Sequence, residues 1–117
     1  MKKSIGQILA GGLPQVLEQE GVDLRLASGE YEGIAGPLKS FTPVISISGS
    51  IRQGKRVQFT ATPGHRTLLY VLKGRVCINQ ESIDPCHLVV FEKENEEIIL
   101  TAEDDAEILF LSAANNP

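Results

Sequence analysis

The sequence predicts a small all-β protein, built as a two-sheet jelly roll or a small barrel. Residues 22–27, 44–51 and 57–62 alternate apolar and polar side chains, which is the period of a strand with one face on a core. Gly, Pro, Asn and Asp residues recur between such segments along most of the chain, as expected for many short strands. A chain of 117 residues that is 42% hydrophobic can bury one compact core.

A helix is predicted only at the start of the chain, as a short extension over residues 1–12. Ser4 and Gln7 have the spacing of a capping box, and Gly11 and Gly12 end the pattern. A single domain is expected over residues 13–114. The last three residues, 115–117, are expected to form a frayed tail.

The strands are predicted in order from their hydrophobic patterns and from the turn residues between them. Pro63–Gly64 predicts a bend, Gly74 a tight turn, and residues 79–82 a further turn. Residues 88–91 form an almost continuous apolar run, typical of a strand covered on both faces. The predicted strands are 22–27, 44–51, 57–62, 67–72, 76–78, 88–91, 98–100 and 108–111.

The charge is distributed unevenly although the net charge is only −4. Residues 1–80 hold ten Lys and Arg against five Asp and Glu, whereas residues 81–117 hold one against ten. The basic side chains are scattered and lack interleaved aromatic residues, so no nucleic-acid partner is expected. The acidic third of one copy could meet the basic part of another, and a solvated charged surface is the other interpretation.

The two cysteines, Cys77 and Cys86, are too few for the disulfide framework of a small secreted protein. Both are expected to be buried free thiols. The chain has no apolar run of membrane length. These observations favour a cytoplasmic protein with no membrane partner.

Residues 70–76, Tyr-Val-Leu-Lys-Gly-Arg-Val, resemble the cupin pattern of a strand that ends in a glycine turn. A series of further fragments follows the order seen in the C-terminal lobe of pirin-family proteins. They are Leu13–Val16, Gly21–Val22, Leu24–Arg25, Gly29–Tyr31, Gly36–Pro37, Thr42–Pro43, Pro63–His65 and Leu100–Asp104. The resemblance covers residues 13–113 and implies a cupin-type double-stranded β-helix. In that family the iron site and the quercetin dioxygenase activity of some members belong to the N-terminal lobe, which we expect this chain to lack.

The cupin metal motif can be tested on this sequence residue by residue. Counting back from Gly74 puts Thr67 at the position of the glutamate ligand. The two histidine positions fall on Thr60 and Thr62, or on Ala61 and Pro63 at the shorter spacing. Aligning Cys86 with the glycine of the second motif puts Glu97 at the remaining ligand position. One carboxylate does not make a metal site, so no metal and no cofactor are expected.

The chain has only two histidines, His65 and His87. His65 follows the Pro63–Gly64 bend, where it could face a ligand, water or a backbone carbonyl. A structural or solvated role is favoured, because no second catalytic group lies at a recognisable offset. His87 is expected to bond the backbone of the turn before it. Cys86 and His87 are adjacent in a strand context and therefore point to opposite faces, which argues against a catalytic pair.

The sequence therefore favours a metal-free, non-catalytic cupin domain that binds a small molecule or assembles with protein. The residues expected around a pocket at the barrel mouth are Thr60, Thr62, Thr67, Glu97 and His65. Inward threonines could instead plug the barrel with bonded hydroxyls. A homodimer is expected, because a cupin lobe without its companion lobe would expose apolar surface. The enzyme alternative is a degenerate pirin-like oxygenase, similar to a quercetinase, or an isomerase that holds metal through unexpected ligands such as His65, His87 and Glu97.

Overall fold

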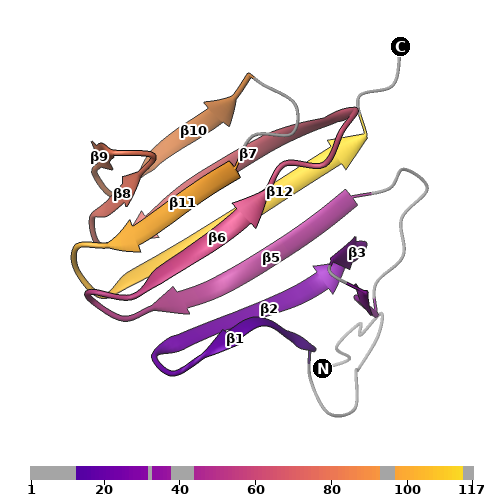
Figure 1. The fold of residues 1–117 in the computed structure, drawn as a ribbon, viewed down its shortest axis with the longest axis horizontal. Coiled ribbons are helices and arrows are strands. Elements are labelled where there is room, and N and C mark those ends of the chain that lie inside the picture. Colours follow the sequence, from indigo (N-terminus) through magenta and orange to yellow (C-terminus); the bar gives the residue numbers. More distant parts are fainter. Residues whose placement is uncertain (1–12, 32, 38–43, 93–96, 115–117) are drawn as a thin grey trace, which may run out of the picture.

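The computed structural model describes residues 13–31, 33–37, 44–92 and 97–114, and in these residues every regular element is a strand (Figure 1). The predicted all-β fold is confirmed, whereas the helix predicted in residues 1–12 and the tail at 115–117 lie outside the described residues. No helix in the described residues is long and apolar enough to cross a membrane. The strands are β1 (Gln15–Gln19), β2 (Val22–Ser28), β3 (Glu30–Tyr31), β4 (Ile34–Ala35), β5 (Val44–Ile51), β6 (Arg56–Thr60), β7 (His65–Lys73), β8 (Val76–Ile78), β9 (Glu81–Ile83), β10 (His87–Phe91), β11 (Glu97–Ala102) and β12 (Ala106–Ala114).

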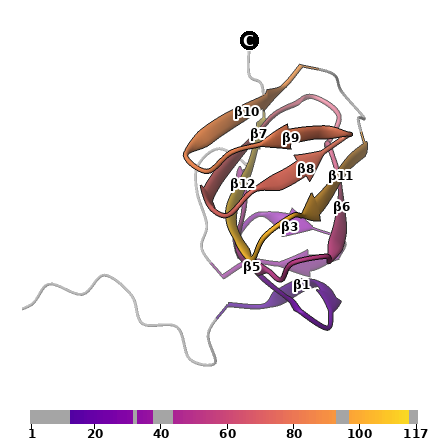
Figure 2. The same ribbon diagram turned by 90° about the vertical axis from the view of Figure 1, so that its left-hand side faces the viewer.

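Two antiparallel sheets face each other and enclose the core, as Figure 2 shows. The larger sheet has the strand order β1-β2-β5-β12-β7-β10, and the smaller sheet has the order β6-β11-β8-β9. The strands β5, β7 and β12 form the centre of the larger sheet, because β12 pairs with both of the others along most of its length. A short β3-β4 ladder lies apart from both sheets.

The core forms because the strands alternate inward apolar and outward polar residues. In β2 the buried positions are Val22, Leu24 and Leu26, and in β5 they are Ile45, Ile47 and Ile51. Each of these strands was predicted with that face inward. In the smaller sheet Val57 and Phe59 of β6 are buried, while Arg56, Gln58 and Thr60 are exposed. The two sheets therefore share one apolar interior.

The predicted turns have the backbone conformations that their residues favour. The His65 amide donates to the Thr62 carbonyl oxygen at 3.0 Å, and Gly64 has φ +77°, so Pro63–Gly64 forms the centre of a type II turn. Gly74 has φ +75°, and a Cβ there would lie 2.4 Å from the carbonyl oxygen of Asp105. Only glycine fits this corner without displacing the backbone opposite.

The structure corrects two burial predictions. Residues 88–91 do form a strand, but Leu88 is 56% exposed and Val90 is 53% exposed, so β10 is not covered on both faces. The reason is that β10 is an edge strand of the larger sheet, and only its Val89 and Phe91 side packs against the core. The two free thiols are not buried either, because Cys77 is half-buried and Cys86 is exposed.

Candidate functional site

The centre of the barrel is filled by aromatic rings rather than left open. Phe59 of the smaller sheet and Phe110 of the larger sheet stack with ring centroids 4.3 Å apart and an interplanar angle of 8°. Tyr31 meets Phe59 edge to face at a centroid distance of 6.4 Å. Its hydroxyl accepts a hydrogen bond of 3.4 Å from the Thr60 amide. The middle of the interior is therefore occupied by aromatic packing, and not by a plug of threonine hydroxyls.

A small polar cluster lies on the inner face of the larger sheet, near the end where β7 begins and β12 ends. Ser112 and Thr67 are opposite each other across β12 and β7, and each is only 1% exposed. His65 is half-buried, and its Nδ1 lies 2.9 Å from the Ser112 Oγ. Thr67 Oγ1 is buried without a hydrogen-bond partner among the described residues. The cluster joins an imidazole and two hydroxyls inside the barrel.

Thr60 does not face this interior. Strand β6 alternates strictly, with Val57 and Phe59 inward, so Thr60 is on the exposed side and Ala61 is the next buried residue. Thr62 is half-buried beyond the end of the strand. Of the two motif spacings considered for the histidine positions, the burial pattern fits the shorter one, with Ala61 inward. The Thr60 side chain therefore lies on the outside of the smaller sheet, whereas the Thr67 side chain faces the interior from the larger sheet.

Thr60 and Thr62 instead line an open depression of about 580 Å³ at the end of β6. The depression brings together residues from β1, β3 and the β6–β7 connection, with one carboxylate, one amide, hydroxyls and apolar side chains. Its described lining residues are Leu17, Glu30, Tyr31, Gln58, Thr60, Ala61, Thr62 and Pro63. Thr67, His65 and Glu97 are not among them. The five residues predicted for one pocket are therefore separated. Thr60 and Thr62 line the depression, His65 and Thr67 belong to the polar cluster, and Glu97 lies at the start of β11.

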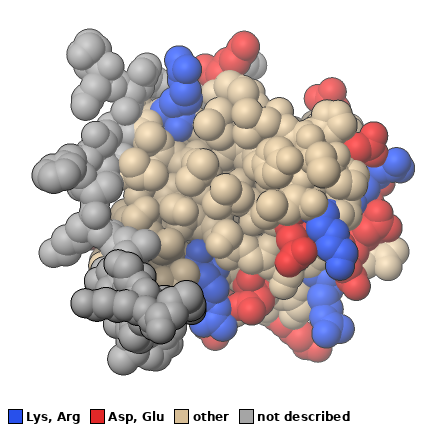
Figure 3. All heavy atoms as spheres, turned by 180° about the vertical axis from the view of Figure 1, so that it is seen from behind, with Lys and Arg blue, Asp and Glu red and all other residues tan. Residues whose placement is uncertain are grey.

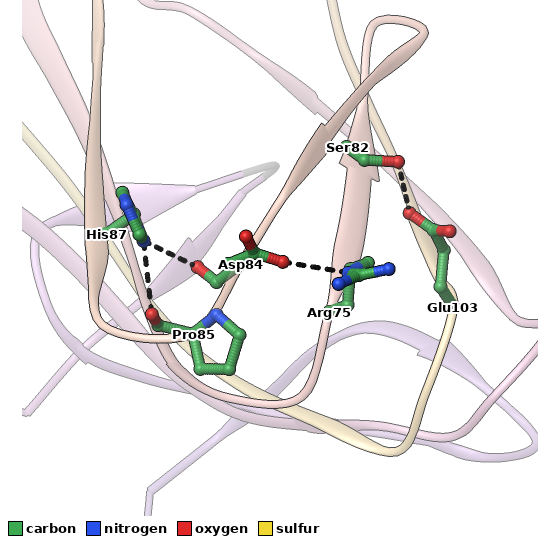
Figure 4. Close-up of polar contacts among 6 residues, drawn as sticks. All are labelled: Arg75, Ser82, Asp84, Pro85, His87 and Glu103. Atoms are coloured by element: carbon green, nitrogen blue, oxygen red, sulfur yellow. Dashed lines mark hydrogen bonds and ion pairs between the residues drawn. The ribbon is translucent and has the colours of Figure 1, made fainter.

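Glu97 is exposed at the start of β11, where its Cα pairs with that of Thr60 on β6. His87 lies at the other end of the barrel and has a structural role, as predicted. Its Nδ1 is 3.2 Å from the carbonyl oxygen of Asp84 and 3.1 Å from that of Pro85, as Figure 4 shows. The same turn is held by an Arg75–Asp84 ion pair of 2.8 Å.

Several residues of these sites were missed from the sequence, and Ser112 and Tyr31 show why. Ser112 continues the inward alternation of Ile108 and Phe110 on β12, and that pattern was the signal available for it. Tyr31 lies in a strand of two residues, too short to produce a periodic pattern. Its position over Phe59 depends on the β3-β4 ladder and could not be found from spacing.

The donor set at the cupin metal positions does not fit a metal ion. The inward positions hold Ala61 and Thr67, with neither imidazole nor carboxylate. Within the described ranges no group of three or more His, Cys, Asp or Glu side chains could hold a metal. These positions therefore lack the nitrogen and carboxylate ligands that a cupin-type metal ion requires.

Comparison with known protein families decides the relationship of the chain. Residues 47–114 match the model of the pirin C-terminal cupin domain, which is more than half of the sequence. The chain belongs to this family. The match begins inside β5 and includes the central strands β7 and β12. The matched part of this pirin-type cupin domain therefore contains strands that contribute to the core.

Three relatives of this pirin-type domain are longer proteins. The chain is 24% identical over 106 residues to a Pseudomonas aeruginosa protein named "Putative quercetin 2,3-dioxygenase PA2418", covering 90% of this chain and 37% of the relative. A crystal structure of quercetin 2,3-dioxygenase from Acinetobacter baumannii superposes with a TM-score of 0.84 at 29% identity, covering 92% of this chain and 38% of that one. The bacterial pirin YhhW from Escherichia coli, solved with nickel(II), shares the fold with a TM-score of 0.68 at 18% identity, over 80% of this chain and 40% of that one. The chain thus spans less than two fifths of the length of the first two relatives.

Proposed function

We propose that this chain is a metal-free, non-catalytic pirin-like cupin domain that acts by binding a small molecule or by assembling with protein. The observation that carries the proposal is the replacement of ligating side chains by Ala61 and Thr67 at the inward positions of the metal motif. The stacked Phe59 and Phe110 rings support it, because they occupy the interior between the two sheets.

The enzyme alternative requires His65, His87 and Glu97 to gather around one metal. His65 begins β7, whereas His87 pairs with Val71 near the end of the same strand. Six residues of strand separate these positions, which corresponds to about 20 Å. First-row metals bind imidazole nitrogen at about 2 Å, so the two histidines cannot share an ion in this fold. A degenerate oxygenase or isomerase with that ligand set is therefore the weaker proposal.

Metal analysis of the protein tests the proposal directly. The chain is purified without chelator, incubated with iron(II), nickel(II) or manganese(II), dialysed, and measured by elemental mass spectrometry. We expect less than stoichiometric metal and no consumption of quercetin under air. Stoichiometric metal that survives dialysis would overturn the proposal, and its loss in His65→Ala or His87→Ala would then identify the ligands.

The depression at the end of β6 supports the small-molecule form of the proposal. Its volume of about 580 Å³ falls in the range of ligand sites, and it combines the Glu30 carboxylate and the Gln58 amide with apolar walls. A ligand-observed NMR screen of hydroxylated aromatic compounds tests this form. Binding should be weakened by Thr62→Trp, which fills the depression, and unchanged in the control Gln80→Trp on the β8–β9 turn. Equal binding by both variants would exclude this depression as the ligand site.

The exposed apolar side chains of β10 support the assembly form. Leu88 and Val90 are each more than half exposed on the same face of β10, and contiguous exposed apolar side chains mark interaction surfaces. We propose that protein covers them in the functional state. The homodimer expected from the sequence is the simplest such assembly, and sedimentation velocity at high micromolar concentration measures it. A monomer under those conditions would contradict the assembly form.

A further inference from the structure

Strand β6 has a free edge on the side of the barrel where β1 lies. Among the described strands, β6 ends the smaller sheet and β1 ends the larger one, and the two are not paired with each other. The Gln19 side chain of β1 donates from its Nε2 to the Arg56 carbonyl oxygen of β6 at 2.6 Å. Further along β6, the Thr60 amide donates to the Tyr31 hydroxyl at 3.4 Å. Two side-chain bridges, rather than a strand ladder, therefore span this part of the barrel wall.

Gln58 lies between the two bridges, and its backbone N–H and C=O have no hydrogen-bond partner among the described residues. The strand register places Gln58 opposite Ile99 of β11. Ile99 uses its own backbone groups on its other side, where its amide donates to the Asn79 Oδ1 at 2.9 Å and its carbonyl oxygen accepts from the Asn79 amide at 3.0 Å. Opposite residues of an antiparallel ladder that do not bond each other direct these groups away from each other. The Gln58 N–H and C=O therefore point outward from the free edge of β6.

The open depression at the end of β6 gives a ligand access to this unpaired residue. Gln58 is one of its lining residues, and so is Tyr31, whose hydroxyl bonds the next outward-pointing amide of the strand. The volume of about 580 Å³ is in the range of small-molecule sites. The depression thus combines enclosed space with a backbone donor and a backbone acceptor that belong to the same residue.

The backbone of β1 is distorted where it borders the depression. Leu17 has φ 50°, a left-handed conformation that is uncommon for a residue other than glycine, and it lies in the bulge between Val16 and Gln19. Strict alternation would turn Leu17 away from the interior, because the adjacent Val16 is buried. The bulge instead lets Leu17 pack against the core and line the depression. Bulges at sheet edges often redirect a side chain at a functional site, and this one supplies an apolar wall.

We propose that the depression binds a short peptide in an extended conformation, one residue of which pairs antiparallel with Gln58. That residue donates its N–H to the Gln58 carbonyl oxygen, and its own carbonyl oxygen accepts from the Gln58 N–H. A parallel arrangement would need the Arg56 carbonyl oxygen or the Thr60 amide as a second partner, and both are already bonded. This inference deepens the small-molecule form of the proposed function and rests on it.

The two side-chain bridges also limit the length of peptide that can pair. The next outward-pointing residues of β6 are Arg56 and Thr60, one on each side of Gln58. Each already uses one backbone group in a bridge. A longer strand therefore gains no second complete pair unless it displaces the Gln19 or Tyr31 side chain. A short peptide is favoured over an extended segment of another protein for this reason.

Two isomeric compounds test the pairing with Gln58. Acetyl-valine dimethylamide keeps the valine N–H and C=O, whereas acetyl-N-methylvaline methylamide lacks that N–H and has the same composition. NMR titration of the full isotope-labelled chain measures both dissociation constants and follows the Gln58 amide resonance. We expect the N-methylvaline isomer to bind at least about threefold more weakly, because it lacks one hydrogen bond. Equal binding by the two isomers would overturn the backbone pairing.

Substitutions at Gln58 test the same pair from the protein side. Gln58→Pro removes the amide N–H, and an edge strand tolerates proline where the N–H is outside the ladder. Gln58→Thr is the matched control, because it changes the same side chain and keeps the N–H. We expect Gln58→Pro to bind the valine dimethylamide at least about threefold more weakly and Gln58→Thr to bind it like the wild type. Circular dichroism melts verify folding, and if Gln58→Pro does not fold, the two isomers decide the question.

Adsorption of the compound on the outer face of the larger sheet is a separate outcome. Figure 3 shows this side of the molecule, where uncharged residues cover the middle. Val90→Ser changes an exposed apolar side chain on this face and should leave binding unchanged. Thr62→Trp should abolish binding, because the indole fills the depression. The opposite pair of results would assign the binding to the outer face and overturn the inference.

Failure of this inference can be distinguished from failure of the proposed function. If hydroxylated aromatic compounds bind in the depression and the valine dimethylamide does not, only the peptide class is overturned. If neither kind of compound binds, this inference and the small-molecule form are both overturned. A capped five-residue peptide that binds more than about tenfold more tightly than the single residue would show that a longer strand displaces the bridges, and it would overturn the restriction to short peptides.

Discussion

The two surfaces of the larger sheet differ in what covers them, although both are largely apolar over β7, β10 and β12. On β12 the inward residue Phe110 is 1% exposed and stacks on Phe59 of the opposite sheet. Its neighbour Leu111 points outward and is only half-buried, with Leu68 beside it. The inner surface is covered by the chain itself, and the outer surface is not.

This difference shows why a run of apolar residues is not enough to predict burial. A continuously apolar strand indicates that both of its faces are buried. It does not indicate whether the second face is buried by the same chain or by another molecule. In β10 the inner side packs on the core through Val89 and Phe91, while Leu88 and Val90 are left exposed by the fold. The exposed half of such a strand is therefore a sign of association.

The largest loss of stability is expected when packing between the two sheets is removed. Phe110→Ala deletes one ring of the central stack, and we expect a loss of about 3–5 kcal/mol in the free energy of unfolding. Leu111→Ala on the same strand is the matched variant on the outer surface. Its loss should be much smaller in dilute protein, because that side chain is not enclosed. Urea titrations measure both, and equal losses would mean that the two surfaces are covered alike.

A smaller change, which is a gain in stability, is expected at the polar cluster that contains Thr67. Thr67 Oγ1 is buried without a partner in the described part of the chain. Replacing the hydroxyl by a methyl group in Thr67→Val removes its desolvation penalty, so stability should rise by about 1–2 kcal/mol. Thr101→Val, on the half-buried side of β11, is the control and should change little. A destabilised Thr67→Val would show that the hydroxyl has a partner, such as an internal water.

The outer surface is expected to make the melting temperature depend on protein concentration. Anything that binds only the folded state raises its melting temperature by mass action. The Tm of the wild-type chain should therefore increase with protein concentration, and the double variant Leu88→Ser with Val90→Ser should lose that dependence. At the lowest concentration the two proteins should differ by less than about 1 kcal/mol, since exposed positions contribute little. Scanning fluorimetry across two decades of concentration measures this.

The smallest effect is expected at the corner that leads into β10. Cys86 has φ +66°, a left-handed conformation that non-glycine residues adopt at some energetic cost, and its amide donates to the Val71 carbonyl oxygen. Cys86→Gly removes that strain but adds freedom to the unfolded chain, so we expect a net gain of about 0.5–1 kcal/mol. Chemical denaturation measures the gain, and the dimer affinity should not change. A clear loss of stability would show that the cysteine side chain has a packing role.

Much of the fold could be predicted from sequence because strand alternation is a local property. The inward residues of β2 and β5 follow from period two alone, and the turns at Pro63–Gly64 and Gly74 follow from residue types that permit positive φ. Strand β1 was missed because a bulge between Val16 and Gln19, with Leu17 at φ 50°, interrupts its alternation. The strands β3 and β9 were missed because two or three residues carry no period.

The candidate site was less predictable, because it depends on which side of each strand faces the interior. Counting from Gly74 found Thr67, which is buried, and also Thr60, which the alternation of β6 turns outward. A shift of one residue in spacing reverses the face, so a motif with two allowed spacings cannot decide it. The His65–Ser112 contact joins residues 47 positions apart and follows only from the pairing of β7 with β12.

The sequence by itself determined the all-β class, most of the strands, the family resemblance and the lack of a ligating side chain at three of the four motif positions, because each is a property of residue types and their local order. The tertiary structure decided what those residues do. It filled the barrel with the Phe59–Phe110 stack, placed Thr60 on the outside, brought His65 next to Ser112, and left Leu88 and Val90 of β10 exposed. These outcomes depend on which strands become neighbours and which strand lies at the edge, and such long-range pairing is set by the packing of the whole chain.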